Sequence, residues 1–189
     1  MIIRIIDGVQ HGQFQDRSEY YGERRSLLGK IVMPITKRLR ANQVLRHMKP
    51  GRRHLDIGCG DGFFLKLSPC SERYGLDELY GEKFEGKLAF EDAFFDYVTM
   101  LAVVEHLDDV PAAFEEVRRV LKPGGSFILT TPKQQADSIL RVVAREVEHI
   151  HQQYFDCHSL PALAGEDFSL THYNTFLLGL NQLFVFQAK

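Results

Sequence analysis

A chain of 189 residues with 44% hydrophobic and 25% charged residues is long enough to bury a core and has the composition of a soluble globular protein. Its formal net charge of −2 excludes a general affinity for nucleic acid, and no apolar run approaches the roughly 18 residues that a membrane span needs. The three scattered cysteines favour a reducing, cytoplasmic setting over a disulfide framework. Nothing in the composition predicts an oligomeric state.

The first fifty residues contain apolar positions at helical spacing. Pro34 interrupts this pattern, so we expect two helices, over residues 19–32 and 35–48. We interpret residues 1–50 as an N-terminal helical cap and residues 51–189 as one compact domain that follows it.

Strand-like and helix-like segments alternate after residue 51, which is typical of an α/β fold with a parallel sheet. Two further strand-like runs near the C-terminus are separated by a glycine-containing turn. The expected strands cover residues 53–57, 73–76, 95–101, 126–131, 169–176 and 182–187, and the expected helices cover residues 62–67, 110–121 and 135–148.

A glycine-rich turn follows the first of these strands. Gly58, Gly60 and Gly62 alternate directly after the apolar run, and glycine permits positive φ and close approach of a ligand to the backbone. Asp77 ends the next apolar stretch about 20 residues on, the spacing at which a carboxylate of a nucleotide-binding fold meets ribose hydroxyls. The pair predicts a nucleotide-like ligand.

The details of this turn argue against two common nucleotide sites. A dinucleotide fingerprint needs glycine at position 63, where this chain has Phe63, and no Gly-Lys-Ser/Thr follows to make a P-loop. Asp56 and Asp61 would repel phosphates but tolerate a cationic ligand.

With these residues in place, the chain resembles the class I S-adenosylmethionine-dependent methyltransferases. Asp56, Gly58, Gly60 and Gly62 match the family's first motif, and Asp77 matches its acid after the second strand. Three later segments are also similar to family motifs, so that five fall in order over residues 53–131. These segments are Leu88-Ala89-Phe90-Glu91-Asp92-Ala93-Phe94-Phe95-Asp96-Tyr97-Val98, Val104-Glu105-His106-Leu107 and Leu121-Lys122-Pro123-Gly124-Gly125.

The resemblance implies a Rossmann-like, doubly wound and mostly parallel sheet that closes with a C-terminal antiparallel hairpin. Between Asp77 and Leu88 the family usually has a helix, a third strand and an adenine-contacting acid, but here only ten residues intervene. We therefore expect a third strand that is short or absent. Glu82 and Glu85 are possible substitutes for the adenine-contacting acid.

The resemblance also implies S-adenosylmethionine as cofactor and methyl transfer to a small-molecule acceptor, as in the branch that contains the ubiquinone and menaquinone methylases. No metal is expected, because His149, His151 and His158 fit no closed zinc pattern. The implied cofactor-binding residues are Asp56, Gly58, Cys59, Gly60, Asp77, Glu78, Leu88, Leu101 and Ala102.

His106 is the candidate general base, since it follows a strand at the edge of the expected pocket. The alternative, which we favour on geometric grounds, is a histidine hydrogen-bonded to backbone. Residues 17–34 and 148–158 are expected to cover the methyl end of the cofactor and form the acceptor pocket, unless the N-terminal helices pack on the far side of the sheet.

Two other functions fit parts of the sequence. The short segment after Asp77 is compatible with a module that binds the cofactor without transferring a methyl group. A nicotinamide-dependent oxidoreductase shares the fold, but Phe63 opposes it.

Overall fold

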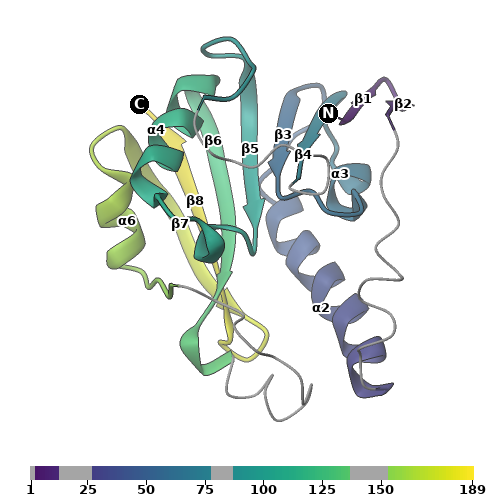
Figure 1. The fold of residues 1–189 in the computed structure, drawn as a ribbon, viewed down its shortest axis with the longest axis vertical. Helices are drawn as coiled ribbons and strands as arrows, with labels where there is room; N and C mark the ends of the chain where they lie inside the picture. The colour runs from purple at the N-terminus through teal and green to yellow at the C-terminus, as the bar shows by residue number, and fades with distance from the viewer. Residues whose placement is uncertain (1–2, 13–26, 78–86, 137–152) are drawn as a thin grey trace.

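The computed structural model describes residues 3–12, 27–77, 87–136 and 153–189, with residues 27–31 described by their backbone alone. Eight strands of this described chain form one sheet in the order β2-β1-β4-β3-β5-β6-β8-β7 (Figure 1). The strands are β1 (Ile3–Ile6), β2 (Val9–His11), β3 (Arg53–Ile57), β4 (Glu72–Leu76), β5 (Phe95–Leu101), β6 (Leu121–Pro132), β7 (Phe168–Phe176) and β8 (Asn181–Ala188).

The centre of the sheet is parallel, as the sequence predicts. Strand β3 pairs with β4 on one side and β5 on the other, and β5 pairs with β6, all in parallel register. Because parallel strands end at the same edge, the segments that follow β3, β4 and β5 meet there.

The outer strands are antiparallel. Strand β8 runs antiparallel to β6 and β7 antiparallel to β8, which confirms the expected C-terminal hairpin. At the other edge β1 pairs antiparallel with β4 and with β2. Residues 3–11 therefore form a sheet hairpin that we did not predict. Its turn is Asp7-Gly8, with φ of 49° and 83°.

The position beside β4 is where a third parallel strand would lie. Among the described residues, no strand occurs between Asp77 and Phe95, and β1 covers that edge of β4 instead. This agrees with the expectation of a short or absent third strand. The division into a cap over residues 1–50 and a domain over residues 51–189 remains a prediction, to which the structure adds that residues 3–11 join the sheet.

Helices cover both faces of the sheet (Figure 1), which makes it doubly wound. Helices α4 (Val110–Val120) and α6 (Ser159–Ala164) pack on one face, and α2 (Leu27–Leu45) and α3 (Phe63–Leu67) on the other. A short 3-10 helix, η2 (Val104–His106), follows β5. No helix in the described ranges is long and apolar enough to cross a bilayer.

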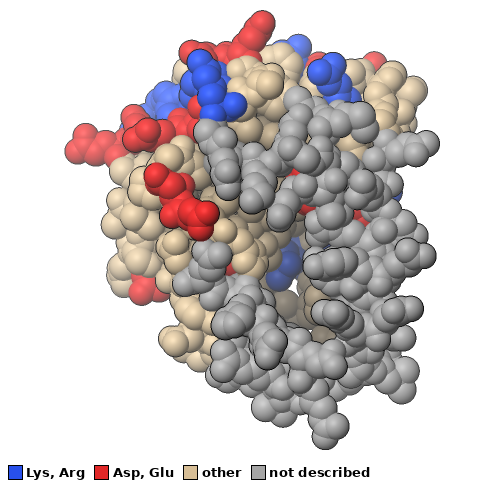
Figure 2. Space-filling view, viewed as in Figure 1, with Lys and Arg blue, Asp and Glu red and all other residues tan. Residues whose placement is uncertain are grey.

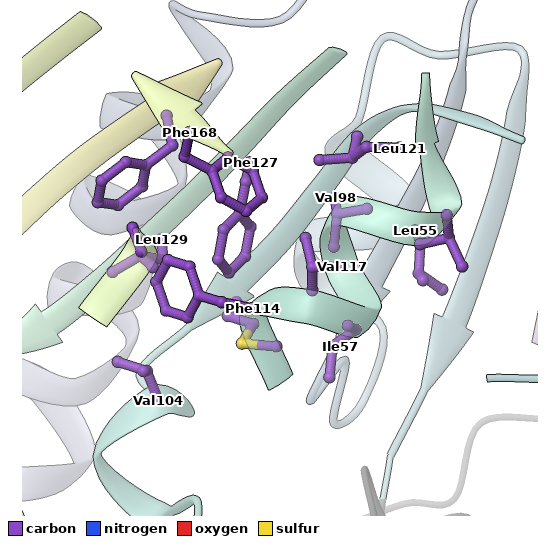
Figure 3. Packing of buried hydrophobic residues seen from close by; sticks show 14 of the residues in the cluster. Leu55, Ile57, Val98, Val104, Phe114, Val117, Leu121, Phe127, Leu129 and Phe168 are labelled. Atoms are coloured by element: carbon purple, nitrogen blue, oxygen red, sulfur yellow. The ribbon is translucent and has the colours of Figure 1, made fainter. Parts of the chain in front are cut away.

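The larger hydrophobic cluster lies between the sheet and α4. Figure 3 shows Phe114 of α4 pointing toward Phe127 and Phe168, and the ring centroids lie 5.1 and 5.7 Å from that of Phe114. Edge-to-face aromatic packing of this kind fixes the helix on the sheet.

The prediction of two helices separated at Pro34 is wrong within the described residues, because α2 runs through Pro34 without a break. Proline removes one helical hydrogen bond. Here Pro34 is exposed, while Ala41 and Val44 in the following turns are buried against the sheet and hold the helix. Residues 19–26 and most of the expected helix 135–148 lie outside the described residues.

Candidate functional site

The glycine turn joins the end of β3 to α3 in a left-handed backbone. Gly58, Gly60 and Gly62 have φ of 77°, 55° and 71°, values that side chains disfavour. The N–H groups of Gly58 and Cys59 both donate to the Leu76 carbonyl, at 2.8 and 3.0 Å. The turn is therefore tied to the end of the neighbouring strand β4.

Space around the turn differs between its first two glycines. A Cβ on Gly58 would overlap Cγ2 of Val103, so a side chain there requires Val103 to move. A Cβ on Gly60 would meet no atom within 4 Å, so the backbone at Gly60 has open space beside it. The turn can thus be approached by a ligand at Gly60.

Asp77 contacts this turn directly. Its Oδ2 accepts a hydrogen bond from the Gly60 N–H at 2.7 Å, and only 7% of the residue is exposed. The structure thus brings together the glycines and the acid that the sequence singled out. The carboxylate also stabilises the turn itself, because it accepts the Gly60 N–H.

Asp56 lies under the turn in a buried polar chain. Its Oδ1 accepts a hydrogen bond from the Thr99 hydroxyl at 2.6 Å, and Thr99 Oγ1 lies 2.8 Å from Nε2 of His54. Sequence analysis missed His54 and Thr99. The sequence did offer a signal: His54 and Asp56 alternate with apolar residues on β3, and Thr99 is a polar residue within the apolar part of β5.

Burial is the main cause of the pKa shifts of Asp56 and His54. It raises the pKa of Asp56 to about 7; the Thr99 hydrogen bond opposes the rise and the nearby charge of Asp77 adds to it. Burial, helped by Arg73, lowers the pKa of His54 to about 3, so its imidazole is neutral at physiological pH.

The end of β5 forms the next part of the same edge. Ala102 has a left-handed φ of 58°, uncommon for a residue with a side chain, and its N–H donates to the Thr130 carbonyl at 2.8 Å. Leu101 is partly buried and packs against the cluster beneath α2. Cys59, in the turn, is buried.

Helix α2 reaches the glycine turn through Lys37. Its Nζ lies 2.7 Å from both carboxylate oxygens of Asp61 and 4.8 Å from the centroid of the Phe63 ring. This contact joins residues 24 positions apart, so no local sequence pattern predicts it.

A second polar group lies beside the start of β8. Arg40, one helical turn beyond Lys37, donates to Oδ1 of Asn181 at 3.1 Å. Burial lowers the pKa of Arg40, and the charge of Glu105 opposes that shift. The next residue, Gln182, donates to the Phe155 carbonyl at 2.8 Å.

The other predicted site residues have different surroundings. Leu88 is buried in the main hydrophobic cluster, and its N–H donates to Oε1 of Glu116 at 2.5 Å. His106 is exposed on η2, and its backbone N–H donates to the Val103 carbonyl. Glu78, Glu82 and Glu85 lie outside the described residues. The proposed roles of all these residues remain predictions.

The acceptor segments are described only in part. Residues 17–26 and 148–152 lie outside the described ranges. Gln153 contacts the segment after β5, since its N–H donates to the Glu105 carbonyl and its Nε2 to the Leu107 carbonyl. In the described part of the chain, no three His, Cys, Asp or Glu side chains group closely enough to hold a metal ion.

Comparison with known families gives one match that covers most of the chain. Residues 23–171 match the family described as "Methyltransferase domain". This range includes the glycine turn, Asp77, the segment after β5 and the start of the C-terminal hairpin.

Two curated relatives share part of this region. The chain is 28% identical over 159 residues to sterol 24-C-methyltransferase ERG6B of Gibberella zeae, a match that covers 67% of this chain and 42% of that protein. It is 30% identical over 149 residues to demethylmenaquinone methyltransferase of Staphylococcus aureus, covering 66% of this chain and 60% of that protein. The chain therefore matches between two fifths and three fifths of the length of these relatives.

A solved structure supports the fold. The PH0226 protein of Pyrococcus horikoshii superimposes with a TM-score of 0.61 at 19% identity, over 90% of this chain and 99% of that chain. At this level of identity the likeness shows a shared fold.

Proposed function

Because this chain belongs to the methyltransferase-domain family, we propose that it transfers a methyl group from S-adenosylmethionine to a small-molecule acceptor. The observation that carries this proposal is the hydrogen bond between the Gly60 N–H and Asp77 at the carboxyl edge of β3 and β4. It joins the predicted backbone cradle to the predicted ribose-binding acid.

The charge of the site suits this cofactor better than a phosphate ligand. Asp56, Asp61 and Asp77 all lie at or under the glycine turn, and Asp56 and Asp77 are close enough to influence each other. S-adenosylmethionine carries a sulfonium and an ammonium group, which carboxylates attract. The pyrophosphate of NAD and the phosphates of ATP would be repelled.

The cofactor, when bound, supplies an already activated methyl group. The protein then needs to align the acceptor with that group and exclude water, which can contribute roughly 7–11 kcal/mol. Gly58, Gly60 and Asp77 would hold the cofactor, and the turn would keep its position through the Leu76 carbonyl. His106, which follows β5 at the same edge, stays the candidate general base for acceptors that must lose a proton, with a structural histidine as the alternative.

The acceptor side would lie between α2 and the start of β8. Arg40 and Asn181 already meet there, and Lys37 ties the same helix to the glycine turn. Figure 2 shows basic and acidic side chains next to one another over the described part of one face, which favours a small acceptor over a polyanion. The two curated relatives are named for sterol and demethylmenaquinone substrates, which also favours a small organic acceptor here.

A ligand screen separates this proposal from its alternatives. S-adenosylmethionine and S-adenosylhomocysteine should raise the melting temperature, because stabilisation grows with ligand excess over the dissociation constant. NAD and ATP at equal concentration should not. Stabilisation by NAD or ATP alone would overturn the cofactor assignment.

Activity needs a separate measurement. With methyl-labelled S-adenosylmethionine and a small-molecule extract, label should move into the organic fraction in the presence of the protein. Tight cofactor binding without any transfer would favour the binding-module alternative.

A further inference from the structure

A polar chain crosses an otherwise apolar layer beneath the candidate cofactor site. His54, Asp56 and Thr99 are exposed by 0%, 1% and 0%. They lie on the sheet face that α2 and α3 cover, where the ring centroids of Phe64 and His54 lie 5.7 Å apart with the rings at 84° to each other. Register explains the contacts, because Asp56 and Thr99 are paired neighbours on β3 and β5.

The number of protons available limits which atoms donate and which accept in the polar chain of His54, Thr99 and Asp56. A threonine hydroxyl has one proton, and an ionised carboxylate can only accept. When Asp56 is ionised, Thr99 donates to it, and the proton between His54 and Thr99 must come from Nε2 of His54. Nδ1 of His54 then carries no proton, and in the described structure it is buried without a hydrogen-bond partner. A protonated Asp56 also permits the reverse arrangement, in which the Asp56 O–H donates to Thr99 and Thr99 donates to His54.

The position of Asp56 links this chain to ligand binding. It lies two residues before Gly58, and Asp77, whose carboxylate holds Gly60, is near enough to raise its pKa. Ionisable side chains on the elements around this face include Arg73 and Asp77 at β4, Tyr97 on β5, Lys66 on α3, Arg40 on α2, His47 just after α2, and the Lys37–Asp61 pair. Of these, Asp77 acts on Asp56 and Arg73 acts on His54.

We propose that His54 and Thr99 are positioning residues for cofactor binding. Through the Thr99 hydroxyl they favour the ionised form of the Asp56 carboxyl and orient it beneath the glycine turn. Approach of a ligand ammonium group then displaces the proton of any protonated Asp56, and that proton passes to the buffer. The inference rests on the proposed function, since it takes an adenosyl amino acid as the ligand.

Isothermal titration with S-adenosylhomocysteine between pH 6 and pH 8, in two buffers of different ionisation enthalpy, tests this coupling. The parent protein should bind about tenfold more tightly at pH 8 than at pH 6, as expected when one carboxyl that titrates near neutrality must be ionised for binding. The buffer dependence should report proton release near pH 6. Asp56→Asn should remove both effects.

Thr99 variants test the positioning role. Thr99→Val removes the hydrogen bond that favours the carboxylate, so the midpoint of the pH profile should move upward by about one pH unit and affinity at pH 7 should fall several-fold. Thr99→Ser keeps the hydroxyl and should keep the parent profile. Thr130→Val is the matched control, because the Thr130 hydroxyl is also buried on the sheet and has no hydrogen-bond partner in the described structure.

The outcomes separate this inference from the proposed function. A parent protein that binds no adenosylhomocysteine at any pH contradicts the proposed function. Binding with the same pH profile in Thr99→Val and the parent contradicts only the role of the polar chain. If Thr99→Val does not fold, His54→Leu replaces it; a smaller upward shift of the midpoint supports the inference, and an unchanged profile overturns it.

Discussion

Both faces of strand β3 are buried from His54 to Ile57 but differ in chemistry. Leu55 and Ile57 point into the aromatic and aliphatic core beneath α4, where they are 0% and 2% exposed. His54 and Asp56, which alternate with them, enter the layer beneath α2 and α3 and form a polar chain with Thr99.

The two faces of β3 contribute differently to stability. Apolar side chains on the first face contribute stability through burial. Burial of an ionisable carboxyl and of an imidazole with an unpartnered Nδ1 costs free energy, so the second face is not optimised for stability. A strand that departs from the apolar pattern on one face only, directly before a glycine turn, is what our proposal of a ligand site at this face predicts.

The largest effect is expected on the apolar face. Leu55→Ala should lower the free energy of unfolding by about 2–5 kcal/mol, because a fully buried leucine leaves a cavity. Urea unfolding measures the loss. The pH profile of adenosylhomocysteine binding should stay that of the parent, and a changed profile would show that the two faces are not independent.

The next effect concerns Gly58, the residue that follows strand β3. Gly58→Ala combines a left-handed backbone with an overlap against Val103, and we expect a loss of about 2–5 kcal/mol in unfolding free energy. Gly60→Ala has the backbone penalty without the overlap and should lose only about 1–2 kcal/mol. Adding Val103→Ala to Gly58→Ala should recover part of the difference; no recovery would disprove the steric explanation.

The pH dependence of the unfolding free energy reports how much burial of Asp56 affects stability. The pKa of Asp56 is raised to about 7 in the folded protein, above its value in the unfolded chain, so the folded state binds more protons between about pH 4 and pH 7. The contribution of Asp56 to the unfolding free energy should therefore fall as pH rises through this window, by up to roughly 4 kcal/mol. His54, whose pKa is lowered to about 3, contributes with the opposite sign over much of the same window in both the parent and the Asp56→Asn variant.

The difference between the parent and Asp56→Asn isolates this contribution, since the variant lacks the titration. Carboxylates with lowered pKa contribute with the opposite sign at lower pH and are present in both proteins; they include Asp61, Asp96, Glu116 and Asp156. Parallel stability curves for the two proteins from pH 4 to pH 7 would contradict the account of Asp56.

Asp77→Asn gives a smaller effect that is confined to binding. Asp77→Asn keeps an oxygen that can accept from the Gly60 N–H but loses the charge and acceptor capacity offered to ribose hydroxyls. We expect adenosylhomocysteine binding to weaken by about 1–3 kcal/mol in a calorimetric titration. Asp77→Ala should also lose stability, since it leaves that N–H unpaired. Unchanged affinity in both variants would remove Asp77 from the site.

The smallest effect is expected at the Lys37–Asp61 ion pair. Its side chains are 44% and 48% exposed, and pairs of this kind contribute at most about 1 kcal/mol. Lys37→Met should therefore change the melting temperature little and leave binding at pH 7 near that of the parent. A large loss of affinity would mean that Lys37 of α2 contributes directly to adenosylhomocysteine binding.

Much of this architecture could be predicted from sequence. The parallel strands β3 to β6 read clearly because apolar runs alternate with helical patterns, and the glycine turn with Asp77 has a fixed spacing. The contact between Gly60 and Asp77 follows from the topology, because neighbouring parallel strands end at one edge.

Other features depended on information that the sequence analysis did not use or that sequence does not hold. The β1–β2 hairpin had a usable signal, an Asp-Gly turn after alternating isoleucines, which we passed over. Pro34 does not break α2, because packing of later turns outweighs one missing hydrogen bond. The His54–Thr99 contact joins residues 45 positions apart and depends on strand register, which no local pattern gives.

A crystal structure of the protein with S-adenosylhomocysteine tests the central claim most directly. That claim places the cofactor at the glycine turn and Asp77, above the polar chain of Asp56, Thr99 and His54. The account predicts the ribose hydroxyls within hydrogen-bond distance of Asp77, the amino acid portion beside Gly58 and Gly60, and the Thr99–Asp56 hydrogen bond intact beneath it. Adenosylhomocysteine bound elsewhere, with Asp77 making no contact to it, would contradict the account.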